Sequence, residues 1–223
     1  MGSNIITKLI DKLPIFKKVN LNIGPKKKIF CILAETGGGK DTIAEFVLNK
    51  YNDILDPVIS YTTRPKRDDE TEGVEHYFRT PDEFHDLMEK NKDNILAYTK
   101  IASKEVPDGY EYMALVDDDK TKSMLYIIDP QGLHYLKRKF KDKYDIISIY
   151  VYAPLDQRRE RARSSRSDFN TEFERRVLAE SLQFDEFRNK KKYDYIVYNF
   201  NHFLRSAIKM VEAIVSYEIS KDI

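Results

Sequence analysis

The stretch Ile29–Thr42 reads IFCILAETGGGKDT and decides how the chain is expected to fold. An apolar run leads into three consecutive glycines and a lysine, and the amphipathic pattern Ile43, Phe46, Val47 follows. Glycines let backbone N–H groups turn inward, and a helix that begins at the lysine points its positive end at the same place. The pattern predicts a phosphate cradle in which Lys40 neutralises the β- and γ-phosphates of a nucleotide.

This loop matches the Walker pattern G-x-x-x-x-G-K-[ST] imperfectly. Ala34 stands where the first glycine belongs, and Asp41 stands where the Mg²⁺-binding hydroxyl belongs, with Thr42 one residue late. A plain turn between a strand and a helix is the alternative explanation, which the strand before and the helix after make less attractive. The residues expected to hold ATP are Glu35, Thr36, Gly37, Gly38, Gly39, Lys40, Asp41 and Thr42.

Composition limits the class of protein. The 223 residues suffice for one well-buried core with mobile subdomains. A net charge of +1 gives no global field for a nucleic-acid polymer or a membrane surface. No apolar run reaches the roughly 18 residues of a membrane span, no signal-peptide core is present, and the single cysteine, Cys31, cannot form an intrachain disulfide. These features predict a cytoplasmic protein without a membrane span, and they leave monomer or homodimer open.

Strands and helices alternate along most of the chain. Short apolar runs with β-branched or aromatic residues predict buried strands, with helical patterns between them. Strand followed by helix, repeated, implies a parallel sheet with helices on both faces. The strands expected after the first are Met124–Ile128, Asp145–Tyr152 and Tyr195–Tyr198, and the helices are Asp41–Tyr51, Gln131–Phe140, Leu155–Arg163, Thr171–Asn189 and Phe200–Glu218.

Two segments depart from this alternation. Residues 60–118 are polar and rich in tyrosine, and they mix short strands with a helix at Pro81–Lys90. We expect an insertion at the carboxyl edge of the sheet, where ligands bind. Residues 4–19 carry a helical apolar stripe, which predicts an N-terminal helical extension over 1–25 that docks on the body, pairs with another copy or touches a membrane surface.

The segment Ser60–Arg67, SYTTRPKR, sets two arginines three residues apart beside hydroxyl side chains. Guanidinium forks bind phosphate oxygens bidentately, so Arg64 and Arg67 are candidates for clamping a phosphate. A solvated loop is the simpler explanation of the run by itself. The cradle upstream and the tyrosines downstream favour phosphate binding.

Four motifs, in this order behind the cradle, resemble guanylate kinases. They are SYTTRPKR, EGVEHYF at Glu72–Phe78, IIDPQG at Ile127–Gly132 and the arginine-rich RRERARSSR at Arg158–Arg166. The resemblance covers about residues 28–215 and implies an α/β, three-layer P-loop NTPase fold with a parallel sheet core. The parts that it implies are a guanylate-kinase-like domain over 26–223, an inserted NMP-binding subdomain at about 60–118 and a lid at about 158–172.

The resemblance also implies an acceptor site for a nucleoside monophosphate. The family holds the acceptor phosphate with two arginines and two tyrosines. Strict alignment gives His76 the position of the first tyrosine with Tyr77 beside it, so either is a candidate, and Tyr112 in GYEYMA resembles the second. The expected acceptor-binding residues are therefore Ser60, Arg64, Arg67, His76, Tyr77 and Tyr112.

Candidate metal ligands lie at the ends of two predicted strands. Asp129 follows the strand Met124–Ile128, where an acid either holds Mg²⁺ directly or through water, or forms a turn before Pro130. Asp41 could take the metal role of the missing hydroxyl, or Thr42 could replace it. The cofactor expected is Mg²⁺, bound together with ATP.

The arginine-rich segment predicts a lid over the transferring phosphoryl group. Five arginines with few nearby acids would repel one another without an anion, although such runs are usually solvated. In a phosphoryl-transfer enzyme they would stabilise charge in the transition state. Spacing favours Arg159 and Arg163 from the lid and Arg176 from the following helix as catalytic residues, together with Lys40.

The family reads guanine with two acids and a hydroxyl that this sequence lacks. Ala97, Ala114 and Ile127 occupy the corresponding positions. Burying guanine donors without acceptors costs about 1–3 kcal/mol per group, and sites select bases by pairing buried polar groups. We therefore expect an altered base preference, with a pyrimidine or a deoxynucleotide among the options. Side chains available nearby to read another base are Tyr98, Lys100 and Gln131.

An ATP-dependent nucleoside monophosphate kinase is the leading hypothesis for the function, with GMP or a related (deoxy)nucleotide as the acceptor. The alternative is a catalytically inactive guanylate-kinase-like module that binds a phosphorylated partner. A nucleotide-dependent switch is a third, weaker option. Lys40, Asp129 and the arginine-rich lid would be superfluous to docking, which favours the enzyme.

Overall fold

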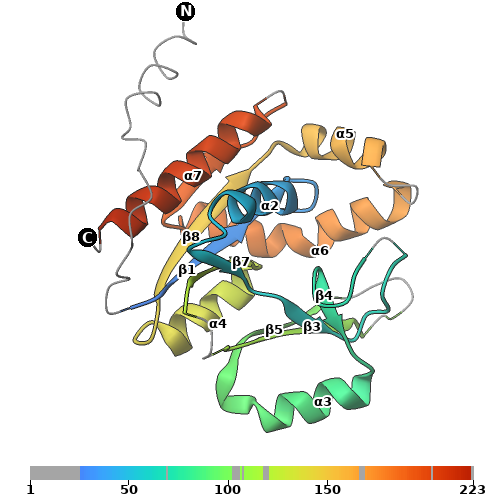
Figure 1. Ribbon diagram of the computed structural model, residues 1–223. Helices are drawn as coiled ribbons and strands as arrows, with labels where there is room; N and C mark the ends of the chain where they lie inside the picture. Colours follow the sequence, from blue (N-terminus) through green and yellow to red (C-terminus); the bar gives the residue numbers. More distant parts are fainter. Residues whose placement is uncertain are drawn as a thin grey trace, which may run out of the picture.

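Two β-sheets form the framework of the protein, as the computed structural model in Figure 1 shows. In the larger sheet every neighbouring pair of strands is parallel. Its strands lie in the order β2 (Leu55–Pro57), β7 (Ser123–Ile127), β1 (Lys28–Leu33), β8 (Asp145–Tyr152) and β9 (Tyr195–Tyr198). The structure describes residues 26–68, 70–101, 106, 108–117, 121–165, 169–201 and 203–221.

Helices cover both faces of the larger sheet. The helices are α2 (Lys40–Lys50) and α7 (Leu204–Ser220) on one face, and α4 (Pro130–Phe140) and α6 (Phe169–Asn189) on the other. Side chains of the central strand alternate between the faces, so that Phe30 packs with α2 and α7 whereas Ile29 packs with α4 and α6. Because both faces are buried, the sequence of this strand is continuously apolar from Ile29 to Leu33. The predicted three-layer α/β fold is confirmed.

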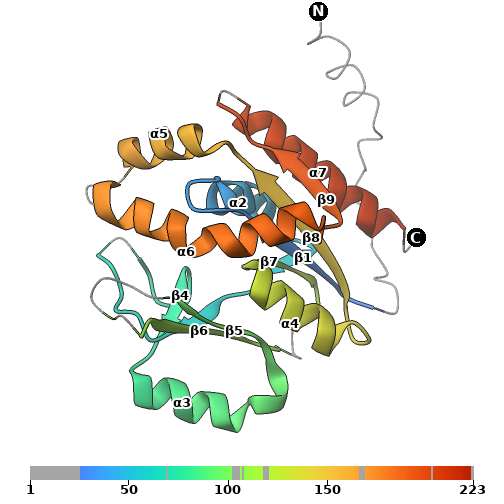
Figure 2. The ribbon, with the colours of Figure 1, turned by 180° about the vertical axis from the view of Figure 1, so that it is seen from behind.

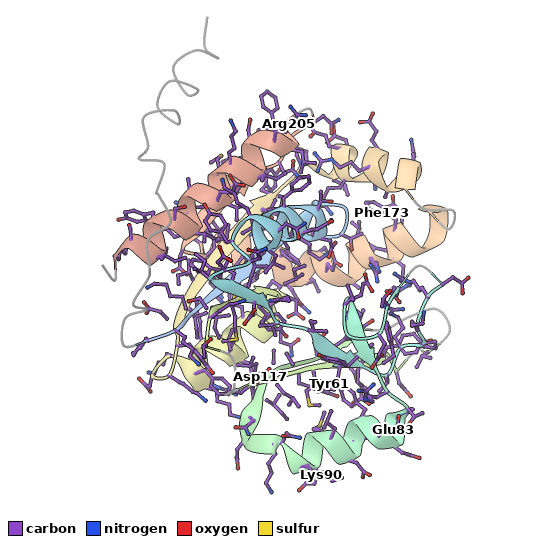
Figure 3. All side chains as sticks on the ribbon, in the orientation of Figure 1. Tyr61, Glu83, Lys90, Asp117, Phe173 and Arg205 are labelled. Carbon is purple, nitrogen blue, oxygen red and sulfur yellow. The ribbon has the colours of Figure 1, made fainter. Side chains whose placement is uncertain are left out.

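A smaller sheet lies in the chain between β2 and β7. Its strands follow the order β4 (His76–Phe78), β3 (Ser60–Thr62), β6 (Tyr110–Leu115) and β5 (Ile95–Ile101), and η1 (Lys92–Asn94) precedes β5. Helix α3 (Pro81–Lys90) begins with a capping box between Thr80 and Glu83 and packs its buried Phe84 against this sheet. In Figure 3, Glu83 and Lys90 mark the two ends of α3, and Tyr61 lies on the sheet beside it.

The two faces of the smaller sheet differ in chemistry. Strand alternation directs Tyr61 and Tyr77, which are paired across β3 and β4, toward α3. The residues that alternate with these tyrosines along the strands point to the opposite face of the smaller sheet. This face turns toward the larger sheet, and we call it the core-side face. The core-side face is made of Ser60, Thr62, His76, Phe78, Ala97, Tyr112 and Ala114.

Helix α5 (Leu155–Ser165) and helix α6 run back along each other as a hairpin. Figures 1 and 2, from opposite sides, show this hairpin, the loop before α2 and the loops of the smaller sheet extending to the same side of the molecule. Phe173 is fully buried near the start of α6 (Figure 3) and fixes that end of the hairpin. The range 158–172 predicted for a lid falls in this hairpin, and part of it lies outside the described residues.

The predicted strands and helices are all present among the described residues, and their ends either coincide with the prediction or are shifted by up to four positions. The largest shift is in the last helix, which begins at Leu204 and not at Phe200. The preceding loop is held by α5, because Arg161 donates to the carbonyl of Asn199 over 2.6 Å and Asn201 N–H donates to Gln157 over 2.6 Å. The extension predicted over 1–25 lies outside the described residues. Among the described helices, none combines the length and hydropathy that crossing a bilayer requires.

Candidate active site

The glycine-rich loop between β1 and α2 requires glycine at two positions. Gly37 and Gly39 have φ angles of 78° and 86°, a left-handed backbone that other residues adopt only at a cost. Space is equally restrictive: a Cβ atom at Gly37 would lie 2.9 Å from the carbonyl oxygen of Arg158, and one at Gly39 would lie 2.6 Å from Nδ2 of Asn199. The loop is therefore enclosed by residues from the far end of the chain.

A buried carboxylate inside the loop anchors it to the core. Glu35 accepts hydrogen bonds from the hydroxyl of Tyr150 at 2.9 Å and from Nη2 of Arg158 at 3.1 Å, and Nη1 of Arg188 lies 3.5 Å away. Burial, followed by the negative charge of Glu35, raises the pKa of Tyr150 above its ordinary value, so this hydroxyl stays protonated and donates. Glu35 thus has a structural role beneath the loop, which its predicted place among the ATP-binding residues did not specify.

Arg158 is the arginine that meets the loop. It is buried, with Nη1 donating to the carbonyl of Thr36 and Nε to that of Ala153, both at 3.1 Å. Its neighbour Arg159 instead forms a two-pronged ion pair with Glu174, at 2.7 and 2.9 Å, which joins α5 to α6. Arg158, which the spacing argument did not single out, is therefore the arginine that contacts the loop, and the catalytic role predicted for Arg159 stays a prediction.

The premise that the arginine run has few acidic neighbours is also corrected. Glu35 pairs with Arg158, and Glu174 pairs with Arg159 while also lying in the field of Arg163. These acids lie far away in the sequence, which is why the run looked uncompensated. Arg163 is exposed and Arg176 is half-buried on α6, and their predicted catalytic roles stay predictions.

A second carboxylate, from a helix outside the loop, accepts hydrogen bonds from the loop. Glu180 of α6 accepts from the backbone N–H of Thr36 and from its hydroxyl, each at 2.7 Å. Asn199, at the end of β9, completes the enclosure because its Nδ2 donates to the carbonyl of Gly38 at 2.9 Å. Oδ1 of Asn199 is buried and has no hydrogen-bond partner among the described residues. Sequence reasoning missed Glu180 and Asn199, and only the position of Asn199 directly after an apolar strand was a usable signal.

Lys40 is the first residue of α2 and its side chain is partly exposed at the loop. Its Nζ lies 3.0 Å from Oδ2 of Asp41, and the helix has no side-chain cap on the N–H groups of its first turn. Uncapped N–H groups at a helix start, together with an ammonium group, form an anion-binding site. This geometry is that of the predicted cradle.

The predicted metal ligands fit Mg²⁺ by the chemistry of their oxygens. Asp129 caps α4, with Oδ1 accepting from Gly132 N–H at 2.7 Å. The end of β7 is held beside the end of β1 by a 3.1 Å bond from Ile128 N–H to the carbonyl of Ile32, so Asp129 and the loop share one edge of the sheet. The described residues contain no cluster of three His, Cys, Asp or Glu suited to a metal. Mg²⁺ needs none, because it is held by one or two carboxylates and substrate phosphates.

The two arginines of SYTTRPKR converge on one carboxylate. Arg64 forms a bidentate pair with Glu70 at 2.6 and 3.0 Å, and Glu70 also accepts from the backbone N–H of Arg67 at 2.8 Å. Burial opposes the charge of Glu70, yet the bonds from Arg64 and Arg67 hold its pKa below the ordinary value. The carboxylate sits where two arginines would hold an anion, and its bidentate geometry is the one that phosphate shares.

The core-side face carries three further predicted acceptor residues beside these arginines. Oγ of Ser60 lies 2.8 Å from Nδ1 of His76, and the rings of His76 and Tyr112 meet edge-on with centroids 5.5 Å apart. Tyr112 is within reach of Arg64, whose pKa it helps to raise against the opposing effect of burial. The structure therefore brings Ser60, His76, Tyr112 and Arg64 together.

Tyr77 is not part of this group. Its ring stacks on Tyr61 at 4.8 Å and lies 5.8 Å from the guanidinium of Arg79, on the α3 side of the sheet. His76 and Tyr77 are consecutive in a strand, so their side chains point to opposite faces. Of the two candidates that the alignment left open, His76 shares a face with Ser60, and the structure does not bring Tyr77 together with them.

The positions that correspond to guanine-reading groups are apolar and tightly packed. Ala97 and Ala114 are paired across β5 and β6 and are buried in the core cluster that α4 contributes to. A Cβ atom on Gly132 of α4 would lie 3.5 Å from the Cβ of Ala97, so little space separates the helix from the strand. An acidic side chain at position 97 would have to displace these apolar neighbours.

Two of the three side chains suggested as alternative base readers are misplaced. The hydroxyl of Tyr98 donates to Glu111 at 2.5 Å, and Glu111 is bound by His85 of α3 at 2.7 Å. Lys100 lies in the field of the same Glu111. Tyr98 and Lys100 therefore face α3, away from the core-side face. Gln131 is exposed in the first turn of α4 and remains a candidate.

An all-parallel sheet whose central strand enters a helix through a glycine-rich loop defines a P-loop α/β protein. The family model described as Guanylate kinase matches residues 26–218. The chain is 30% identical to the guanylate kinase of Rickettsia conorii over 210 residues, covering 94% of this chain and 86% of that protein. It is 31% identical to the guanylate kinase of a Wolbachia species over 174 residues, covering 77% and 84%.

A solved structure agrees with these relatives. The crystal structure of guanylate kinase from Anaplasma phagocytophilum matches with a TM-score of 0.62 at 20% identity, covering 86% of this chain and 87% of that one. The chain belongs to the guanylate kinase family. The resemblance that four motifs predicted is confirmed. Membership of this family supports a nucleotide-binding kinase fold.

Proposed function

We propose that this protein transfers the γ-phosphoryl group of ATP to a nucleoside monophosphate. The observation that carries the proposal is a pair of separate regions whose hydrogen-bond donors suit an anion. In each region, a carboxylate of the protein itself accepts hydrogen bonds from these donors. Glu180 binds the N–H and hydroxyl of Thr36 at the loop, and Glu70 binds Arg64 and Arg67 at the smaller sheet. One phosphorylated ligand would need only one such region, whereas a transfer between two nucleotides needs both.

In this proposal the loop binds the donor and the core-side face binds the acceptor. Lys40 and the N–H groups at the start of α2 hold the phosphates of ATP, and Arg64 and Arg67 exchange Glu70 for the acceptor phosphate. Mg²⁺ bound with ATP, held by Asp41 or Thr42 and by Asp129, would neutralise phosphate charge. No covalent intermediate is required, because positioning and charge neutralisation account for most of phosphoryl-transfer catalysis.

The proposal assigns the segment 60–118 to the acceptor and the α5–α6 hairpin to a lid. Arg158 and Arg161 fasten α5, and Glu180 fastens α6, to the loops of the core, so the part of the hairpin proposed to close is the end where α5 meets α6. Arg163 and Arg176 are the residues of the hairpin that would add positive charge over the transferring group. Closure would exclude water, which strengthens each of these interactions.

The acceptor base is proposed to be read without the acids that select guanine. Ala97, Ala114 and Ile127 offer no side-chain acceptors for guanine donors, and Gly132 packs against Ala97 where a larger group would have to fit. Two unpaired donors at about 1–3 kcal/mol each correspond to a loss of discrimination between roughly 30-fold and 10⁴-fold. At least one other monophosphate should match GMP in kcat/KM.

One observation favours the alternative function, a module that binds a phosphorylated partner without turnover. The carboxylate of Glu180 lies against Thr36, where its negative charge opposes the phosphates of ATP. In a binding module this contact would be permanent. In an enzyme ATP must displace it, so measured binding of ATP separates the two functions.

The decisive experiment is a panel of ribo- and deoxynucleoside monophosphates assayed with Mg·ATP for ADP release, with the Lys40→Ala variant as the background. Turnover of one or more acceptors well above that background supports the kinase. Turnover of GMP alone would contradict the altered base preference but not the kinase. Binding of a monophosphate without any turnover, and without binding of ATP, would favour the module.

A further inference from the structure

His76 is the ionisable centre of the core-side face, next to the place that the proposed function gives to the acceptor phosphate. Its Nδ1 is engaged with Oγ of Ser60 at 2.8 Å, and its ring contacts Tyr112 edge-on. Its second ring nitrogen, Nε2, has no hydrogen-bond partner among the described residues. One nitrogen is therefore fixed in position while the other remains available to a ligand.

The surroundings of this imidazole favour its neutral form when no ligand is bound. Burial is the largest effect and the positive charge of Arg64 the next, and both lower the pKa of His76. Glu70 and Glu75 oppose them, together with the hydrogen bond to Ser60, but the pKa stays below the ordinary value. Glu70 is already committed to Arg64, and Tyr112 on β6 is the other titratable group facing the ring.

Binding of a phosphate dianion favours the protonated form of His76 instead. It brings close to two negative charges into a site whose present carboxylate, Glu70, carries one. An opposite charge within about 4–6 Å favours the charged form of a titratable group. When both nitrogens of histidine carry hydrogen, both donate, so Nδ1–H can keep Ser60 while Nε2–H is offered to the phosphate.

We propose that His76 takes up a proton from solvent when the acceptor phosphate binds, so that acceptor binding in this protein is coupled to pH. The proposal rests on the proposed function, which supplies the phosphate. A tyrosine at this position would donate a neutral hydrogen bond across the same pH range, because its phenol titrates near 10. The histidine therefore makes acceptor affinity decline as pH rises between the pKa values of the free and bound states.

Calorimetry measures this coupling directly. GMP, and the best acceptor of the panel if that is another nucleotide, is titrated at one pH in buffers of different ionisation enthalpy. The slope of observed enthalpy against ionisation enthalpy gives the protons taken up. Wild type should take up roughly half a proton more than His76→Phe or His76→Tyr. The difference between proteins cancels the titration of the nucleotide itself.

His85 provides the matched control. It belongs to the same subdomain but is exposed on the α3 side and bound to Glu111. His85→Gln should retain the proton uptake of the wild type, and ATP binding should show no difference between any of these proteins. A purely structural role of His76 would weaken acceptor binding without changing the number of protons.

A second measurement needs no variant at position 76 to fold. The chain has four histidines, and the C2 proton of one should report a pKa that rises by about one unit when the acceptor is added to wild type. Acceptor binding with equal proton uptake in wild type and folded His76→Phe, or with unmoved histidine pKa values, overturns the inference and leaves the proposed function intact. Failure of wild type to bind any monophosphate overturns both.

Discussion

The two regions proposed to bind phosphate are built in opposite ways. The loop at Gly37–Gly39 is held by residues more than a hundred positions away, through buried contacts to its backbone carbonyls and to Glu35. The acceptor region is held by neighbours in sequence, since Arg64 and Glu70 are six residues apart and Ser60 and His76 sixteen. Substitutions that break the contacts of the first region should therefore disturb the packing of distant elements, whereas those in the second should act locally, within the smaller sheet.

The largest effect is expected from Arg158→Met. Removing one partner of a buried ion pair costs about 3–5 kcal/mol of unfolding free energy, and the lower end applies because Arg188 remains 3.5 Å from Glu35. Urea denaturation followed by circular dichroism measures the change. The matched control is Arg159→Met, which breaks the surface pair with Glu174 and should leave the midpoint close to wild type. Equal destabilisation by both variants would refute the buried role of Arg158.

Lys40→Ala should separate catalysis from stability at the loop itself. We expect a fall in kcat of at least about a hundredfold, because a charge positioned on the transferring group is worth several kcal/mol in a dry site. The melting temperature should hardly change, since Lys40 pairs with the exposed Asp41. Lys50→Ala, at the other end of α2, is the control for the assay. Near-normal turnover by folded Lys40→Ala would reject the cradle.

Arg64→Ala and Arg67→Ala should weaken the acceptor without weakening ATP. A hydrogen bond to a charged group is worth about 1.5–3 kcal/mol, so the acceptor dissociation constant should rise roughly 10-fold to 150-fold, and less for the exposed Arg67. Titration calorimetry with each nucleotide measures both affinities. Arg79→Ala is the control, because Arg79 lies on the α3 face beside Tyr61 and Tyr77. If ATP loses as much affinity as the acceptor, the placement of the two sites is wrong.

The smallest effect has the opposite sign. Glu180→Gln keeps a hydrogen-bonding side chain at Thr36 but removes the charge that ATP must displace. Charged hydrogen bonds exceed neutral ones by about 1 kcal/mol, so ATP should bind roughly fivefold more tightly. Fluorescence displacement of a labelled ATP analogue gives the comparison with wild type. Unchanged or weaker ATP binding would show that Glu180 does not compete with phosphate.

The contrast also explains which parts of the site the sequence could predict. The strand Ile29–Leu33 and the glycines behind it were readable because strand, turn and helix adjoin along the chain. Arg158 was not, because α5 is so rich in charge that no apolar stripe fixes which face of the helix points inward, and the partner Glu35 lies 123 positions away. The apolar residues at positions 97 and 114 were readable, but the packing of Ala97 against Gly132 depends on how closely α4 approaches β5.

The choice between His76 and Tyr77 shows a second limit. Alternation along β4 guarantees that the two side chains lie on opposite faces, but it does not say which face carries Ser60. That depends on the parallel register of β3 with β4, in which Ser60 meets His76 and Tyr61 meets Tyr77. The register between two strands separated by a loop cannot be read from the sequence of either strand alone.

The residues that contact the glycine-rich loop lie far along the chain, which determines when during synthesis the loop can reach its final structure. Tyr150, Arg158, Glu180 and Asn199 contact residues 35–38 across separations of 115, 123, 144 and 161 positions. A ribosome-bound chain that has emerged only through β7 carries the complete glycine motif but none of these four residues. Contacts of such long range form late. Nascent chains should therefore acquire ATP affinity only after β9 has left the exit tunnel, so the cradle becomes functional long after its own residues have been translated.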